Sequence, residues 1–226
     1  MTSHQPRGRA EASWLSSFGT PERPRSVDGH ALWPGPTGWS VAALRAPRTV
    51  DYVLVCPKTG PLDWWWGMGP PRGVAALCSL YLADPRLVPM LRSVCSAGTP
   101  AVFVGDMDPV GIAQYLAVRR MLRARRGPTL RFGGINDEWL AAIRRARRRS
   151  LLPEEGLRIR MERDEVRLWR RLEEDTDVEE MIGPEGCRIL RSGYKLELEA
   201  ASNPGILRPE HKKWVFCHLR AVAFGD

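Results

Sequence analysis

The sequence lacks the cysteine patterns that are typical of zinc clusters and of disulfide-stapled domains. Its cysteines are odd in number and no two of them form a C-x-x-C pair; they are Cys56, Cys78, Cys95, Cys187 and Cys217. We therefore expect reduced, mostly buried thiols. No apolar run approaches the roughly 18 residues of a membrane-spanning helix, and the opening residues, MTSHQPRGRAEASW, contain no apolar export segment. These absences predict a cytoplasmic protein that does not span a membrane.

Histidine is also scarce, and the four histidines lie outside every motif described below. Because they share no helix-face spacing, we assign none of them to catalysis or to a metal. Positive charge, in contrast, is abundant: the net charge is +8, mainly from arginine, whose planar fork suits phosphate groups. This charge favours a polyanionic partner, although a composition bias toward arginine and alanine explains it equally well.

The most informative stretch is AVFVGDMDPVGIAQYLAVRRML, residues 101–122. Its first part, 101–105, predicts a short buried strand, and residues 112–125 predict an amphipathic helix. Asp106 and Asp108 follow the strand at its carboxyl end, where open α/β sheets bind ligands. Asp108 also fits the N-cap of the helix, with Pro109 at its first position. Asp106 has no such structural role, and two carboxylates this close repel each other unless a hard cation such as Mg²⁺ relieves the repulsion.

The pattern G-D-x-D-P-x-G after a strand resembles the second motif of the Toprim domain, in the form found in topoisomerase VI A subunits and in the Wadjet JetD nuclease subunit. In those relatives the two aspartates bind Mg²⁺ for phosphodiester chemistry on DNA. The resemblance implies an α/β, Toprim-like (Rossmann-like) domain with a mostly parallel sheet and helices on both faces. It also implies that Asp106 and Asp108 are catalytic residues and ligands of Mg²⁺ or Mn²⁺.

A second run, CRILRSGYKLELEAA at 187–201, resembles the late motif K-x-E-I-Q-A-L of topoisomerase VI A subunits, with Lys195 and Glu197 in place. The resemblance adds Glu197 to the catalytic and metal-binding set, and we assign Lys195 to nucleic-acid binding. The residues alone are equally consistent with a plain strand of alternating pattern, in which Tyr194, Leu196 and Leu198 point inward.

One expected acid is missing. In Toprim families the strand that corresponds to residues 49–56 ends in a glutamate, whereas here it ends in Cys56, Pro57 and Lys58. Neither cysteine nor proline can replace a carboxylate as a hard ligand or as an acid/base group. The acid must then come from Asp63 or Glu197. Alternatively, the Lys58 ammonium pairs with the aspartates in place of a metal ion.

The remaining segments predict how the chain is organised. Proline-rich residues 1–47 predict a partly ordered N-terminal arm, and 48–226 a single Toprim-like α/β domain. Within the domain we expect helices at 73–83, 85–96 and 164–175, a strand at 130–132, and a helix beginning at Asp137. The sequence IRRARRR in this last helix is the densest basic cluster, which is either a solvated face or a phosphate-backbone contact formed by Arg144, Arg145 and Arg148.

Together these features predict a metal-dependent, nuclease-like protein acting on DNA, with Mg²⁺ polarising the scissile phosphate and water as the nucleophile. A nuclease is favoured over a topoisomerase because residues 1–47 leave no room for a winged helix with a nucleophilic tyrosine. Its relatives suggest a role in anti-plasmid defence or DNA maintenance, together with other subunits of a larger complex. The alternative is a catalytically degraded Toprim-like module that binds DNA or a partner protein.

Overall fold

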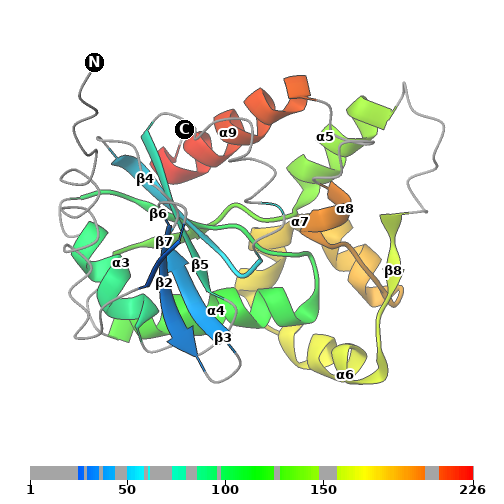
Figure 1. The fold of residues 1–226 in the computed structure, drawn as a ribbon. Coiled ribbons are helices and arrows are strands. Elements are labelled where there is room, and N and C mark those ends of the chain that lie inside the picture. Colours follow the sequence, from blue (N-terminus) through cyan, green and yellow to red (C-terminus); the bar gives the residue numbers. More distant parts are fainter. Residues whose placement is uncertain are drawn as a thin grey trace, which may run out of the picture.

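The computed structural model describes residues 25–27, 30–35, 38–43, 50–58, 61, 73–79, 86–95, 98–124, 128–147, 157–201 and 209–225. Their main feature is a seven-stranded sheet in the order β1-β2-β3-β5-β4-β6-β7 (Figure 1). A separate two-stranded sheet, β8-β9, lies in the second half of the chain. None of the described helices is long and apolar enough to cross a membrane.

The parallel half of the large sheet contains β4 (Val50–Cys56), β5 (Gly73–Ser79), β6 (Ala101–Phe103) and β7 (Leu130–Phe132). These strands pair in parallel in the order β5-β4-β6-β7. The central strands are apolar runs because helices or loops cover both faces of a parallel sheet. The predicted strands at 49–56, 101–105 and 130–132 are confirmed, as is the α/β, Rossmann-like fold class with its mostly parallel core.

The other half of the sheet is antiparallel and comes from the region predicted to be an arm. β1 (Arg25–Val27), β2 (His30–Gly35) and β3 (Gly38–Ala43) form a meander, and β3 pairs antiparallel with β5. Part of the segment that was predicted to be a partly ordered arm, 1–47, thus extends the sheet. Pro34 does not prevent pairing, since it sits at a shift of register, where a sheet tolerates a residue without an N–H.

The prediction of a helix at 73–83 is wrong, because this segment contains β5. Its residues Gly73–Ser79 pair with β4 on one side, and β3 pairs with β5 along the other edge. Val74 and Leu77 are three residues apart, as in a helix, but they belong to a short continuous apolar run that also suits a strand buried on both faces. Pairing with two neighbouring strands decides between these options.

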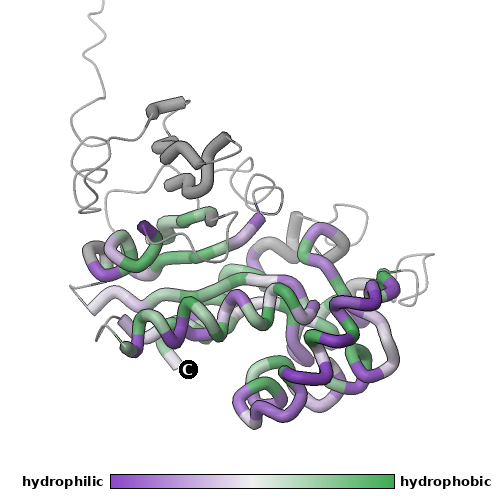
Figure 2. The backbone as a smooth tube through the Cα atoms, turned by 90° about the horizontal axis from the view of Figure 1, so that it is seen from below, coloured by the Kyte–Doolittle hydropathy of each residue, from purple (hydrophilic) through white to green (hydrophobic). Residues whose placement is uncertain are grey.

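Helices cover both faces of the parallel strands. On one face α4 (Pro109–Ala124) packs through Tyr115, whose ring lies 5.7 Å from that of Phe103 on β6. On the other face α9 (Pro209–Phe224) packs near Val102, the β6 neighbour of Phe103, because a Cβ at Gly133 would touch both Val102 and Leu219. α3 (Leu87–Cys95) packs beside α4, and α5 (Asp137–Arg147) contacts α9 through Trp139 and Trp214. Figure 2 shows the hydrophobic residues concentrated in the strands between these helices.

The remaining elements form a lobe beside the carboxyl ends of the strands (Figure 1). They are β8 (Ile159–Arg160), α6 (Arg163–Leu172), α7 (Thr176–Arg191), β9 (Tyr194–Lys195) and α8 (Leu198–Ala201). An antiparallel bridge between Met107 and Leu196 joins this lobe to the segment that follows β6, with backbone N–H to oxygen distances of 3.0 and 3.1 Å. The lobe therefore presents residues 195–199 to the end of β6.

The run at 187–201 is not the long strand that its alternation predicted. It begins inside α7, forms only two residues of β9 and ends in α8. Leu196 and Leu198 are buried as expected, but Tyr194 is 41 % exposed, contrary to the prediction. The alternation fails at Tyr194 because β9 pairs with the exposed strand β8 in a two-stranded sheet, and in the described part of the chain this side chain is left partly open to solvent.

Candidate acid pocket at the ends of β4 and β6

Asp108 is held in place by the start of α4. Its Oδ1 accepts a hydrogen bond from the Gly111 backbone N–H at 2.5 Å, which makes it the N-cap, and Pro109 is the first helical residue. Both predictions for this turn are confirmed. Gly111 favours the close approach, because a Cβ there would lie 3.0 Å from both the Asp108 Oδ1 and the Asp106 carbonyl oxygen, which is a tight contact.

Asp106 is almost fully buried, with 5 % of its surface exposed. Its Oδ1 accepts a hydrogen bond from the Leu198 N–H at 2.7 Å, and its Oδ2 lies 2.9 Å from the Lys58 Nζ. Burial raises the pKa of Asp106 to about 6, even though the Leu198 N–H and the Lys58 charge both favour the ionised form. Burial also raises the pKa of Asp108. Both aspartates therefore lie in an environment that penalises uncompensated negative charge.

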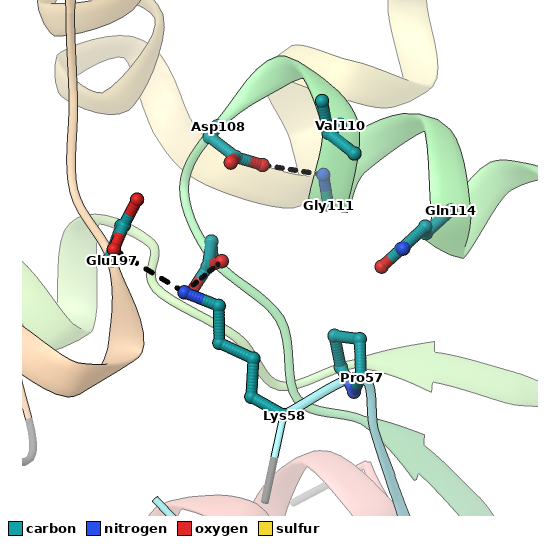
Figure 3. A pocket seen from close by; sticks show the side chains of 8 residues that line it. Pro57, Lys58, Asp108, Val110, Gly111, Gln114 and Glu197 are labelled. Atoms are coloured by element: carbon teal, nitrogen blue, oxygen red, sulfur yellow. Dashed lines mark hydrogen bonds and ion pairs between the residues drawn. The ribbon is translucent and has the colours of Figure 1, made fainter. Parts of the chain in front are cut away.

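Lys58 supplies the compensating charge from the end of β4. Its Nζ contacts Asp106, the Glu197 Oε2 at 3.5 Å and the Glu199 Oε2 at 2.6 Å. Burial alone would lower the pKa of Lys58, but the hydrogen bond to Glu199 and the charge of Asp106 outweigh it and raise this pKa well above the usual value. Lys58 is therefore a permanent cation at the centre of the acidic side chains. Figure 3 shows it extended from β4 toward Glu197.

Lys195 is the centre of a second group of ion pairs, which shares Glu197 with the group around Lys58. Its Nζ lies 2.7 Å from the Glu165 Oε1 on α6 and 3.4 Å from the Glu197 Oε1. Glu197 thus lies between two lysines, one on each of its oxygens. Lys195 was predicted to bind nucleic acid, but its side chain is only 12 % exposed and is engaged by these acids. In this arrangement Lys195 holds Glu197 in position through an ion pair within the protein.

The acidic side chains open onto a pocket of about 230 Å³. Its lining consists of Pro57, Lys58, Asp106, Asp108, Val110, Gly111, Gln114 and Glu197. The structure thus brings together all three acids predicted for the site, and their charges outnumber that of the single lysine in the lining. Gln114 lies on α4 on the side of the pocket opposite Glu197 (Figure 3).

A metal ion does not fit this arrangement as it stands. Among the described residues, no three His, Cys, Asp or Glu side chains converge closely enough to hold one. Lys58 already contacts both Asp106 and Glu197, and a divalent cation placed between them would repel its ammonium. Asp63, the other acid considered from the sequence, lies outside the described residues.

One arginine of the basic cluster of α5, Arg144, is engaged in contacts within the protein. Arg144 forms a two-pronged ion pair with Glu185 on α7, with one nitrogen to oxygen distance of 2.7 Å. Arg145 is exposed, and Arg148 lies outside the described residues. Asp137, at the start of α5, also accepts the backbone N–H groups of Glu185 and Gly186 at 3.1 and 2.8 Å. Arg144 therefore helps to join α5 to the second half of α7.

Two residues of this region were missed in the sequence. Glu165 lies in a helix rich in alternating charges, where nothing distinguishes it from its solvated neighbours. Gln114 is one helical turn after Val110, so the helix predicted after Asp108 was enough to place it on the pocket side. No protein-family model matches the chain, and no curated protein matches it either.

Proposed function

We propose that this chain is a Toprim-like module that binds DNA without cutting it, in which the Lys58 ammonium takes the place of a divalent cation. One observation carries the proposal: Lys58 Nζ lies 2.9 Å from Asp106, the buried acid of the D-x-D motif. Lys58 directly follows Cys56 and Pro57, the positions at which Toprim proteins carry a glutamate. A negative charge at the end of β4 is thus replaced by a positive one. The Lys58 ammonium then neutralises the acids of the pocket, so that a divalent cation is no longer needed for this.

The ion pairs support a permanent rather than an incidental role for Lys58. An ammonium that contacts Asp106, Glu197 and Glu199 is held by side chains from two separate segments. Because these groups are partly shielded from water, their attraction is stronger than that of an ordinary surface pair. Removing the cation would leave the buried Asp106 carboxylate without its ion-pair partner, which is costly.

Binding of DNA is supported by the overall charge of +8 and by its arginine content. The pocket itself is a poor place for a phosphate, because its lining carries more carboxylates than cations. In this proposal DNA therefore contacts a surface outside the pocket.

The metal-dependent DNA endonuclease predicted from the sequence remains a second candidate. Glu197 favours it, since this acid lines the same pocket as Asp106 and Asp108 and offers the carboxylate missing from β4. Activity of this kind requires Lys58 to leave the acids first. The two candidates therefore differ in one testable property, the affinity of the acidic side chains for a divalent cation while Lys58 is present.

The proposal is tested by titrating wild type and Lys58→Ala with Mn²⁺. The electron paramagnetic resonance signal of the free ion decreases as the ion binds, and this decrease measures the affinity. The variant should bind Mn²⁺ at least about tenfold more tightly, because removing a charge at this distance is worth more than about 1.4 kcal/mol. Lys213→Ala, which removes an exposed lysine on α9, should behave like wild type. Adding Asp106→Ala to Lys58→Ala should abolish the gained binding. Equal Mn²⁺ affinity in wild type and Lys58→Ala would contradict the proposal.

A plasmid-nicking assay separates the two candidates directly. Wild type should bind supercoiled plasmid in EDTA and leave it intact with Mg²⁺ or Mn²⁺. Cleavage that needs the metal and disappears in Asp106→Ala would establish the nuclease instead. Absence of DNA binding under all conditions would remove both candidates.

A further inference from the structure

We infer that the outer face of α6 is the surface that contacts the phosphate backbone of duplex DNA. This inference rests on the proposed function and names the contact that it requires. The arginine face, as we call it, is formed by Arg163, Arg167, Arg170 and Arg171, all of them exposed. Their spacing of four, three and one residues places them on one side of a helix. In Figure 1, α6 lies at the lower edge of the molecule.

The opposite side of α6 is anchored, so the arginines cannot turn inward. Trp169 is buried, and Val166 and Leu172 pack partly buried against the core. Glu165 fixes the start of the helix, because its Oε2 accepts the Glu162 N–H at 2.8 Å while its Oε1 binds Lys195. A helix held by its apolar and acidic side presents the arginine face at a fixed orientation.

Four other arginines, two in the lobe and two on α4, are paired with acids of the protein itself, whereas exposed Arg123 and Arg160 have no ion-pair partner among the described residues. Arg188 lies 3.0 Å from Glu185, and Arg191 lies 3.2 Å from Glu173. Arg119 and Arg120 on α4 likewise pair with Asp177 and Asp175. The charge of the four paired arginines is largely compensated within the fold, so these four side chains offer little net attraction to an anion.

The arginine face differs because most of its charge has no such partner. Among the described residues, Arg167 has an ion pair, with Asp164 at 3.1 Å, and both of these side chains are largely exposed. Within the part of the chain that the structure describes, Arg163, Arg170 and Arg171 have no acid within ion-pair distance. Three guanidinium groups without an ion-pair partner among the described residues, on one rigid surface, favour an external polyanion.

The dimensions of the arginine face suit a DNA strand. From Arg163 to Arg170 the helix advances by about 10 Å at 1.5 Å per residue. Duplex DNA carries a phosphate per strand every 3.4 Å or so of its axis, so this length spans about three phosphates. Each guanidinium can donate two parallel hydrogen bonds to a phosphate, which a lysine cannot do. The same fork also fits a carboxylate, so it is the regular spacing of phosphates along a strand that makes us name duplex DNA, rather than an acidic protein, as the ligand.

The arginine face also points away from the acid pocket. Glu165, which reaches the pocket through Lys195 and Glu197, projects from the other side of the same helix. A duplex bound on the arginine face would thus not bring its phosphates to Asp106. Binding at this surface is therefore independent of Lys58 and of any divalent cation.

The test compares two double variants that remove the same charge: R163A/R170A on the arginine face, and R188A/R191A on α7, whose arginines are paired. Binding to a labelled duplex is measured by fluorescence anisotropy over a series of salt concentrations. R163A/R170A should weaken binding by roughly tenfold or more and reduce the slope of log affinity against log salt by about two. R188A/R191A should change neither. Asp164→Asn, which removes the acid beside the arginine face, should tighten binding.

The outcomes distinguish this inference from the proposed function. If wild type binds no duplex, the proposed function fails and the inference falls with it. If wild type binds but the two double variants lose affinity equally, or not at all, only the arginine face is refuted. Polyglutamate represents an acidic protein: if it displaces the duplex as effectively as unlabelled DNA at equal charge, the preference for DNA is wrong.

Discussion

The carboxyl ends of β4 and β6 lie side by side in the sheet, yet they are built in different ways. The end of β6 carries negative charge, Asp106 and Asp108, on a segment held by backbone contacts and by the first turn of α4. The end of β4 carries positive charge on Lys58, a long side chain held only by the acids it contacts. One half of the site is fixed by backbone geometry and the other by electrostatics, so the two halves should respond to different perturbations.

The largest effect should come from disturbing the backbone of the β6 end. A Cβ at Gly134 would collide with the Gly105 carbonyl oxygen and lie 2.7 Å from the Gly105 nitrogen, directly before Asp106. The backbone of Gly105 cannot move aside easily, so Gly134→Ala should lower the free energy of unfolding by about 3 kcal/mol. Urea denaturation followed by circular dichroism measures this change.

Gly98→Ala is the matched control for that measurement. Gly98 has a φ of 83° but no atom within 4 Å of the position of its missing Cβ. It should lose only about 1 kcal/mol, from backbone strain alone. If Gly134→Ala is no more destabilising than Gly98→Ala, the β6 end is less rigid than the contacts indicate.

The second effect concerns the electrostatics between the two strand ends. Burial raises the pKa of Asp106 from 3.8 to about 6, so between these pH values the native state binds more protons than the unfolded state. The stability of the wild type should therefore fall, relative to Asp106→Asn, as the pH rises through this range. The pKa of Asp106 is raised by about 2 units, and each unit corresponds to about 1.4 kcal/mol. The difference in the free energy of unfolding between the two proteins should therefore change by about 3 kcal/mol, and the change should be complete above about pH 6.

Urea denaturation of both proteins at several pH values between about 4 and 7.5 measures this difference, and comparing the pair cancels the titration of other groups. A stability difference that stays constant across the range would mean that Lys58 and the Leu198 N–H keep Asp106 at its ordinary pKa. That result would make Lys58 more dominant in the site than we propose.

The sequence predicted the β6 end because the interactions there are local. Asp108, Pro109 and Gly111 lie within four residues of one another, and the cap, the first helical residue and the close approach follow from residue type alone. The same holds for the strands at 49–56 and 130–132. β5 was mistaken for a helix because its identity depends on pairing with β3 and β4, which no local pattern reveals.

The partners in the site were harder to predict because they are distant in sequence. Lys58 and Glu199 are 141 positions apart, and Arg144 and Glu185 are 41 apart. A lysine after a strand or an arginine in a basic run could equally face solvent, a phosphate or an acid of the same chain. The sequence raised the pairing of Lys58 with the aspartates as an alternative, but only the arrangement of the lobe decides which acids it contacts.

The smallest predicted effect concerns Asp108 and separates its two roles, as a helix cap and as a charge facing the pocket. Asp108→Ala removes the acceptor of the Gly111 N–H and should lower the free energy of unfolding by about 1 kcal/mol. Asp108→Asn keeps an oxygen acceptor and should retain the cap. Because burial penalises the ionised form of Asp108, as its raised pKa indicates, the asparagine variant should be at least as stable as the wild type at neutral pH. Equal destabilisation of both variants in thermal or urea denaturation would show that the charge of Asp108, attracted to Lys195 and Lys58, matters more than its cap. In that case electrostatics would hold both strand ends.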